Sequence, residues 1–222
     1  MIKLFNRDCL DTLDKMIDKG VQVDCIVTDP PYKVTSRGGR TSAGGMMLNK
    51  EVRKGTVFKH NNIHISDWLY KLYAILKESG HCYIMTNNKN LYPFLQEIDK
   101  SDFKLIKTMV WVKDNKIMSQ AYMSQFEFIL FLRKGKFKKI NNCGTSDILE
   151  FKNPKNKKHP SEKPIDLLET LILNSSDEND LILDPFMGSG STLVACKNLN
   201  RRGIGIELDK EYFEIAQDRI YK

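Results

Sequence analysis

A short run of polar and rigid residues, Asp29-Pro30-Pro31-Tyr32, follows a strand-like apolar segment and is the first candidate for chemistry. The two prolines fix the backbone and remove two N–H donors, so nearby carbonyl groups are left as acceptors beside a carboxylate and an aromatic ring. This set suits an exocyclic amino group on a flat base: Asp29 and the Pro30 carbonyl accept its two hydrogens, and Tyr32 stacks on the ring. The alternative is a proline-rich strand end with a tyrosine in the core.

A glycine-containing loop, Asp184-Pro185-Phe186-Met187-Gly188-Ser189-Gly190-Ser191-Thr192, follows another strand-like segment and leads into a helical pattern. Gly188 and Gly190 permit a tight turn and a close approach of a ligand to the backbone. A second acid, Glu207, ends the next strand-like segment about 20 residues later, a spacing at which nucleotide-binding folds hold ribose hydroxyls. No lysine follows the glycines, and GxGxxG is absent, so neither a P-loop nor a nicotinamide oxidoreductase is indicated. The order predicts an adenosine-containing ligand.

Two further segments extend this pattern. Asp8-Cys9 is followed by Leu10 and Leu13, and His159-Pro160-Ser161-Glu162-Lys163-Pro164 stands just ahead of the glycine loop. Together the four segments resemble the amino-methyltransferases of DNA, over nearly the whole chain. Because Asp-Pro-Pro-Tyr precedes the glycine loop, the chain resembles the circularly permuted β group of that family.

The resemblance implies S-adenosylmethionine as the cofactor. It implies that Asp8 lies near the adenine, Glu207 on the ribose and Asp184 near the methionine moiety, and that the segment 159–164 helps to hold the methionine end. The cofactor contacts expected on this basis are Asp8, Cys9, Asp29, His159, Ser161, Lys163, Asp184, Phe186, Gly188, Ser189, Gly190 and Glu207.

The activity implied is methyl transfer to the N6 amino group of adenine in duplex DNA. An amino nitrogen on a base is a poor nucleophile because its lone pair is delocalised into the ring. Accepting both hydrogens at Asp29 and Pro30 favours a localised lone pair, alignment with the methyl donor supplies much of the rate, and the carboxylate stabilises the developing positive charge. The base must leave the duplex, and Tyr32 is the expected stacking platform.

Other activities remain as alternatives. Cytosine-N4 methylation is the nearest, although its enzymes often have Ser where this chain has Asp29; a structured-RNA methyltransferase and a catalytically silent DNA-binding relative are others. Carbon-5 methylation of cytosine needs a nucleophilic cysteine, normally after a proline, and none of the five cysteines follows one. Scattered cysteines without CxxC predict reduced thiols, mostly in the core. His60 and His64 lack a third ligand, so no metal site is predicted.

The elements that must position these motifs alternate between strands and helices, which predicts an α/β, doubly wound, mostly parallel sheet. The resemblance implies a seven-stranded Rossmann-like methyltransferase sheet in permuted order. Strands are expected at 2–5, 23–28, 82–86, 105–112, 126–132, 181–183 and 203–206, and helices at 66–76, 164–173, 192–199 and 210–220. Segments 105–112 and 126–132 lack room for a crossover helix and are predicted to be an antiparallel pair. Trp111, Phe126, Phe128 and Phe131 are expected in the core, and Trp68 in helix packing.

Charge is concentrated in two segments. The chain carries 35 Lys and Arg against 28 Asp and Glu, a net charge of +7, whereas 33–59 alone nets +6 and 133–158 nets +7. Two basic segments on an acidic body predict a polyanion, double-stranded DNA, at one face. The residues expected to contact phosphates are Lys33, Arg37, Arg40, Arg53, Lys54, Arg133, Lys134 and Lys136.

The length of 222 residues fits a single methyltransferase domain, 1–222, in which the basic loops 33–60 and 133–158 supply DNA recognition. No separate recognition domain fits, which leaves room for a second subunit in a homodimer to add contacts. A cognate restriction endonuclease of the same system is a further partner to consider. No apolar run approaches ~18 residues and no signal peptide is evident, so no membrane association and a cytoplasmic location are predicted.

Overall fold

The computed structural model describes residues 1–31, 63–118, 121–155 and 162–222. The chain divides into two compact units, one formed by Met1–Pro30 with Ile65–Lys222 and the other by Pro31–His64. The helices and strands given below belong to the first unit. The predicted recognition loop 33–60 lies outside the described residues.

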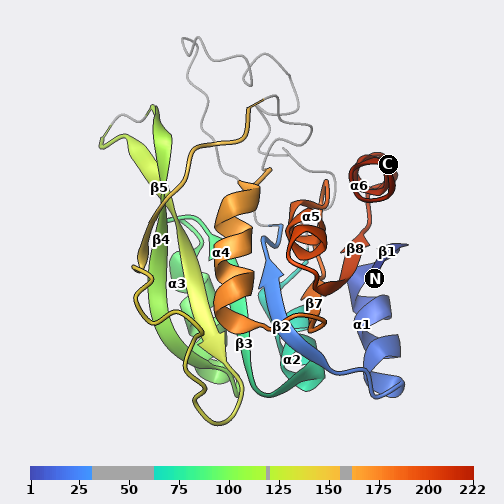
Figure 1. Ribbon diagram of the computed structural model, residues 1–222. Coiled ribbons are helices and arrows are strands. Elements are labelled where there is room, and N and C mark those ends of the chain that lie inside the picture. Colours follow the sequence, from blue (N-terminus) through green and yellow to red (C-terminus); the bar gives the residue numbers. More distant parts are fainter. Residues whose placement is uncertain (32–62, 119–120, 156–161) are drawn as a thin grey trace. The chain divides into compact units, whose positions relative to one another are not determined.

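A single eight-stranded sheet forms the centre of the first unit, in the order β1-β8-β7-β2-β3-β5-β4-β6 (Figure 1). Its parallel neighbours are β1 (Ile2–Asn6), β8 (Arg202–Glu207), β7 (Leu181–Asp184), β2 (Val23–Thr28) and β3 (Leu76–Thr86). The remaining strands are β5 (Ser124–Arg133), antiparallel to both β3 and β4 (Lys104–Ile117), and β6 (Ile148–Glu150), parallel to β4. The mostly parallel α/β sheet and the antiparallel β4–β5 pair are confirmed. The predicted number of strands is wrong by one, because β6 forms inside the segment expected to be the loop 133–158.

Helices cover both faces of the sheet, as in a doubly wound fold (Figure 1). One face carries α4 (Ile165–Ser175), α5 (Ser191–Asn198) and α6 (Lys210–Tyr221), and the other carries α1 (Cys9–Asp18), α2 (Ile65–Ile75) and α3 (Leu91–Lys100). Helices α1 and α3 are missing from the sequence prediction. Asp8 nevertheless gives α1 a clear N-cap, because its carboxylate accepts the N–H groups of Leu10 and Asp11 at 2.7 and 3.3 Å.

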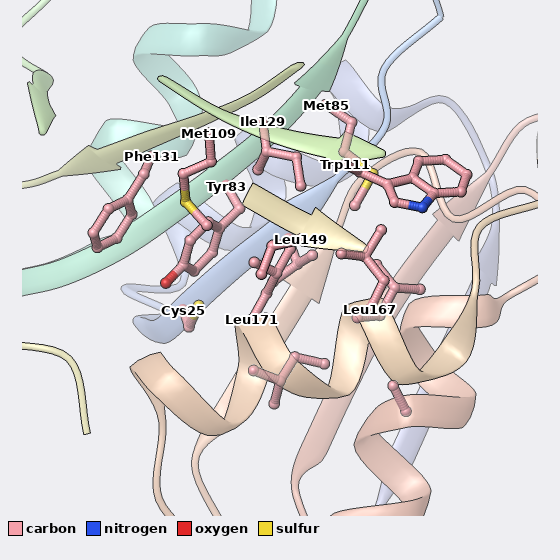
Figure 2. Close-up of a cluster of buried hydrophobic side chains, with 14 of the residues drawn as sticks. Cys25, Tyr83, Met85, Met109, Trp111, Ile129, Phe131, Leu149, Leu167 and Leu171 are labelled. Carbon is pink, nitrogen blue, oxygen red and sulfur yellow. The ribbon is translucent and has the colours of Figure 1, made fainter. Parts of the chain in front are cut away.

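The core on the α4 side is built from alternate residues of neighbouring strands, because side chains two apart point to one face. Figure 2 shows these side chains directed toward α4: Cys25, Tyr83, Met85, Met109, Trp111, Ile129 and Phe131 meet Leu149, Leu167 and Leu171. Trp111 and Phe131 are therefore core residues, as predicted. Trp68 of α2 is 1% exposed and packs against Phe94, which confirms its role in helix packing.

The prediction that Phe126 is buried is wrong, since its side chain is 47% exposed. The pairing of β3 with β5 ends where Thr86 meets Phe128, and Phe126 lies beyond this point, paired only with Val112 of β4. Phe128, at the last pair, is half-buried.

All five cysteines are free thiols, and four of them are buried while Cys143 is exposed. This agrees with the expectation of reduced thiols that lie mostly in the core. None of the helices in the described part of the chain is long and apolar enough to cross a membrane.

Candidate active site at the carboxyl edge of the sheet

Four acidic side chains stand in a row where parallel strands end. Asp29 follows β2, Asp184 ends β7, Glu207 ends β8 and Asp8 stands two residues past β1, so they occupy four neighbouring strands. We call this side of the sheet, at the ends of β1, β8, β7, β2 and β3, the carboxyl edge, and the opposite side the amino edge. Adjacent strands lie about 4.8 Å apart, so the row spans roughly 15 Å.

The row crosses the point where the chain changes direction through the sheet. From β7 the chain continues to β8 on one side, whereas from β2 it continues to β3 on the other. Ligands of open α/β sheets bind in the crevice at such a switch point. The Thr28 hydroxyl donates a 2.9 Å hydrogen bond to Asp184 Oδ1 and so joins the two strands there. The two motifs, far apart in the sequence, are thus held side by side.

Asp184 is 4% exposed and already accepts three hydrogen bonds. Besides Thr28, the donors are the Phe186 N–H at 3.1 Å and the Thr192 hydroxyl at 2.6 Å. Burial raises the pKa of Asp184 to about 6, against the lowering effect of the hydroxyl donors. Asp184 therefore holds the two ends of the segment 184–192 together through its hydrogen bonds to Phe186 and Thr192.

Glu207 holds the other end of the glycine loop. Its Oε2 accepts the Gly188 N–H at 2.9 Å, and its Oε1 accepts the Asp209 N–H at 2.8 Å. Burial raises the pKa of the Glu207 carboxyl, while these backbone donors act in the opposite direction. Each oxygen retains a further lone pair, so Glu207 can accept hydroxyl groups of a ligand.

Gly190 needs to be glycine for two reasons. Its φ is +79°, in the left-handed region, and a Cβ added there would lie 2.9 Å from the Ala216 Cβ of α6. Gly188 also has a positive φ, of +52°. The glycine spacing therefore serves a turn that packs closely against α6.

Arg219 of α6 is a loop-holding residue that the sequence analysis missed. Its Nη1 donates to the backbone oxygen and the hydroxyl of Ser189, both at 2.9 Å, and to the Ser191 hydroxyl at 3.2 Å. Its Nη2 lies 3.0 Å from Glu162 Oε1. Arg219 therefore ties the glycine loop to the segment before α4. An arginine near the chain end carries no sequence signal of this role.

Asp29 lies in a different environment, among charges. Lys163, just ahead of α4, contacts Asp29 Oδ2, whereas Oδ1 is buried and accepts no hydrogen bond from the residues that the structure describes. Burial raises the pKa of Asp29, and the nearby Lys163 ammonium opposes this rise. Pro30 is buried beside it, and Pro31 follows directly in the chain. Glu127 of β5, which the sequence analysis also missed, lies 3.5 Å from Lys163 through its Oε2.

Two other expected cofactor residues have structural contacts. Phe186 packs edge-on against Trp68 of α2, with ring centroids 5.5 Å apart. The Cys9 thiol is buried at the start of α1, and burial raises its pKa to about 12. Burial also raises the pKa of Cys25, Cys82 and Cys196. Because the thiolate is the nucleophile, none of these four cysteines is suited to attack a base.

The basic residues at and just after the end of β5 lie at the amino edge. Arg133 pairs with His81 of β3, and His81 pairs with Cys25 of β2, four residues before Asp29. The Lys134 ammonium donates to the Tyr73 carbonyl at 2.7 Å, so it caps the end of α2, and the Lys136 N–H donates to Glu78. The structure does not bring Arg133, Lys134 and Lys136 together with the carboxyl edge.

The other expected site residues lie outside the described parts of the chain. They are Tyr32, the phosphate-contact candidates Lys33, Arg37, Arg40, Arg53 and Lys54, and the segment residues His159 and Ser161. Among the residues that are described, no group of His, Cys, Asp or Glu could hold a metal ion.

Comparison with known proteins decides the family. Residues 23–218 match the family model of N6/N4 methyltransferases described as DNA methylase. The chain belongs to this DNA methylase family. It is 32% identical over 243 residues to the Type II methyltransferase M2.DpnII of Streptococcus pneumoniae, across 98% of this chain and 88% of that protein.

Solved structures agree with the DNA methylase fold. The crystal structure of the M1.HpyAVI–SAM complex has a TM-score of 0.77 at 28% identity, covering 99% of this chain and 100% of that chain. The PvuII DNA methyltransferase, described as cytosine-N4-specific, has a TM-score of 0.74 at 17% identity, covering 98% and 86%. The second likeness concerns the fold alone. The expected family and Rossmann-like architecture are therefore confirmed, while the β-group assignment stays a prediction.

Proposed function

We propose that this protein is an S-adenosylmethionine-dependent methyltransferase that methylates the N6 amino group of adenine in duplex DNA. The observation that carries the proposal is the Asp29 carboxylate, placed at the switch point beside the glycine loop with Oδ1 buried and available as an acceptor. Family membership supports a DNA substrate. The choice of adenine depends on Asp29, because cytosine-N4 enzymes often begin the corresponding motif with Ser.

The carboxyl edge fits the proposed cofactor. Glu207 would accept the ribose hydroxyls, since its oxygens are fixed by backbone donors and retain lone pairs. Asp8, on the neighbouring strand end, would face the adenine, and the turn at Gly188 and Gly190 lets a ligand approach the backbone. When bound, S-adenosylmethionine supplies a methyl group on a sulfonium and is released as the neutral thioether. The complex of M1.HpyAVI supports this cofactor for the present chain.

Asp29 and Pro30 would prepare the target nitrogen. Asp29 Oδ1 accepts one amino hydrogen and the Pro30 carbonyl accepts the other, which favours a localised lone pair on nitrogen. As the N–C bond forms and the C–S bond breaks, positive charge develops on nitrogen, and the preorganised Asp29 carboxylate stabilises it. The nitrogen then loses one proton, which the Asp29 carboxylate would accept because it is the more basic of the two acceptors. The base must be flipped out of the duplex, with Tyr32 as the proposed stacking residue.

The relatives suggest the biological setting. M2.DpnII is named a Type II methyltransferase, so we infer that this enzyme protects DNA in a restriction-modification system with a cognate endonuclease. We infer action on cytoplasmic DNA, by a single domain that recognises DNA chiefly through 33–60. A homodimer would extend this small recognition surface.

Product analysis tests the proposal. Purified protein is incubated with S-adenosylmethionine and plasmid DNA from a host lacking DNA methylation, and the nucleosides are analysed by mass spectrometry. N6-methyladenine is expected; N4-methylcytosine would reassign the base, and no methylated base would reject the activity.

Asp29→Ala should abolish methyl transfer but change the S-adenosylmethionine affinity by no more than about tenfold, or ~1.4 kcal/mol. Asp218→Ala, at an exposed pair on α6, is the control.

A further inference from the structure

A cluster of charged side chains continues the apolar core at the carboxyl edge, with buried lysines and partly buried carboxylates. Residues two apart on a strand point to the same face of the sheet. Asp29, Lys113 and Glu127 therefore lie on the same face as Val27, Trp111 and Ile129, which belong to the core on the α4 side. These apolar residues pack against α4, as Figure 2 shows for Trp111 and Ile129. Lys163, immediately before α4, completes the cluster. Two carboxylates and two ammonium groups thus lie over the end of the core.

The charges alternate in sign along the cluster. The Lys113 ammonium contacts Glu127 Oε1 and lies 4.8 Å from the centre of the Trp111 ring. Glu127 Oε2 is 3.5 Å from Lys163 Nζ, and Lys163 contacts Asp29 Oδ2. Lys113 and Lys163 are 9% and 6% exposed. Such burial is tolerated because each ammonium faces a carboxylate.

The two oxygens of Asp29 therefore differ. Oδ2 is engaged by Lys163, while Oδ1 is buried and accepts no hydrogen bond from any described residue. On its other side Lys163 forms a longer ion pair with Glu127 Oε2, at 3.5 Å and without a hydrogen bond, and Glu127 Oε1 contacts Lys113. This chain of contacts holds Oδ2 of the Asp29 carboxylate at the switch point.

We propose that Lys163, anchored by Glu127, is a positioning residue that holds Asp29 by Oδ2 and so presents Oδ1 to the target amino group. This inference rests on the proposed function. It differs from the role implied by the family resemblance, in which the segment containing Lys163 holds the methionine end of the cofactor. The two roles predict different losses when Lys163 is replaced: a positioning residue affects turnover, and a cofactor contact affects S-adenosylmethionine affinity.

The charges also predict a distinctive pH dependence. The groups facing Asp29 are Lys163 before α4, Glu127 of β5, Lys113 of β4 and Asp184 of β7. Lys163 lowers the pKa of Asp29 and Glu127 raises it. If transfer needs ionised Asp29, the rate falls as pH drops through this pKa. Lys163→Met should then move the acidic limb of the kcat profile to higher pH, and Glu127→Gln should move it to lower pH.

The test uses single-turnover transfer of tritiated methyl groups to unmethylated plasmid DNA across a pH series. Lys163→Met should lower the rate about 100-fold, as small misplacements of a reacting group do, with S-adenosylmethionine affinity unchanged by calorimetry. Lys163→Arg, which keeps a cation, should recover part of the rate. Lys107→Met, at an exposed ion pair on the same strand as Lys113, and Glu97→Gln are matched controls.

Defined results overturn the inference. Acidic limbs that stay at the wild-type pH in both variants would exclude the positioning role, as would a loss of cofactor affinity in Lys163→Met with kcat unchanged. If Lys163→Met does not fold, because a buried partner is left unpaired, the direction of the Glu127→Gln shift decides alone. A wild-type protein that methylates no DNA would instead reject the proposed function.

Discussion

The carboxylates of Glu207 and Asp29 differ in the hydrogen bonds that they already accept. Both Glu207 oxygens are fixed by backbone N–H groups, at Gly188 and Asp209. Asp29 has one oxygen on an ammonium group and one with no described donor. A carboxylate fixed by neutral donors suits the binding of hydroxyls, whereas one with an open buried oxygen suits an amino group that gains positive charge. The residue types alone could not distinguish these environments.

At Glu207, replacement by alanine should weaken S-adenosylmethionine binding by about 10- to 100-fold, because a hydrogen bond to a charged group contributes roughly 1.5–3 kcal/mol. Calorimetric titration measures the change. Glu214→Ala, at an exposed position on α6, should leave the affinity unaltered. Equal affinities in wild type and Glu207→Ala would remove Glu207 from the cofactor site.

Some elements with clear apolar patterns were predicted well, whereas the amphipathic helices α1 and α3 were missed, and so was β6, which depends on a tertiary contact. β2 (Val23–Thr28) and α6 (Lys210–Tyr221) agree with their predicted ranges to within a residue, because β2 is a short apolar run that ends at a proline motif and α6 is an amphipathic segment. β6 has only three residues and exists through its pairing with β4. The loop prediction for 133–158 failed there because a short strand needs a partner that local sequence does not reveal.

The candidate site shows the same division. The motif residues Asp29, Asp184 and Glu207 were identified because their types and spacing carry chemistry. Glu127, Lys163 as a partner of Asp29, and Arg219 are brought in by the sheet register and by α6, which spacing does not encode.

The glycine loop offers a test at the scale of one element. Gly190 and Gly20 both have positive φ, +79° and +62°, but a Cβ at Gly20 meets nothing within 4 Å. Alanine at either position should cost about 1–2 kcal/mol of folding free energy through backbone strain. Gly190→Ala should cost about 1–3 kcal/mol more, because its Cβ would crowd Ala216 of α6. Urea unfolding of both variants measures the difference. Equal losses of folding free energy in the two variants would mean that α6 moves away from the added Cβ without a measurable cost.

At the scale of the whole molecule, the sheet separates two edges with different roles. The acids that face the proposed cofactor and base gather at the carboxyl edge. At the amino edge, the Lys134 side chain serves the fold, because it caps α2. A count of charge along the sequence treats both basic segments alike, and only the strand directions distinguish them. A duplex that delivers a base to Asp29 must approach the carboxyl edge.

DNA binding should therefore depend unequally on the two basic segments. The affinity should fall with salt at a slope of about −0.9 per phosphate neutralised. Replacing Arg37, Arg40, Arg53 and Lys54 together by glutamine should flatten this slope by up to about 3 to 4 units. Arg133→Gln with Lys136→Gln should leave it nearly unchanged, because Arg133 lies at the amino edge and Lys136 follows it. Lys134 is kept, since its loss would uncap α2. Fluorescence anisotropy with a labelled duplex across a salt series measures the slopes. A larger change in the Arg133/Lys136 variant would place the DNA across the amino edge and contradict delivery of the base to Asp29.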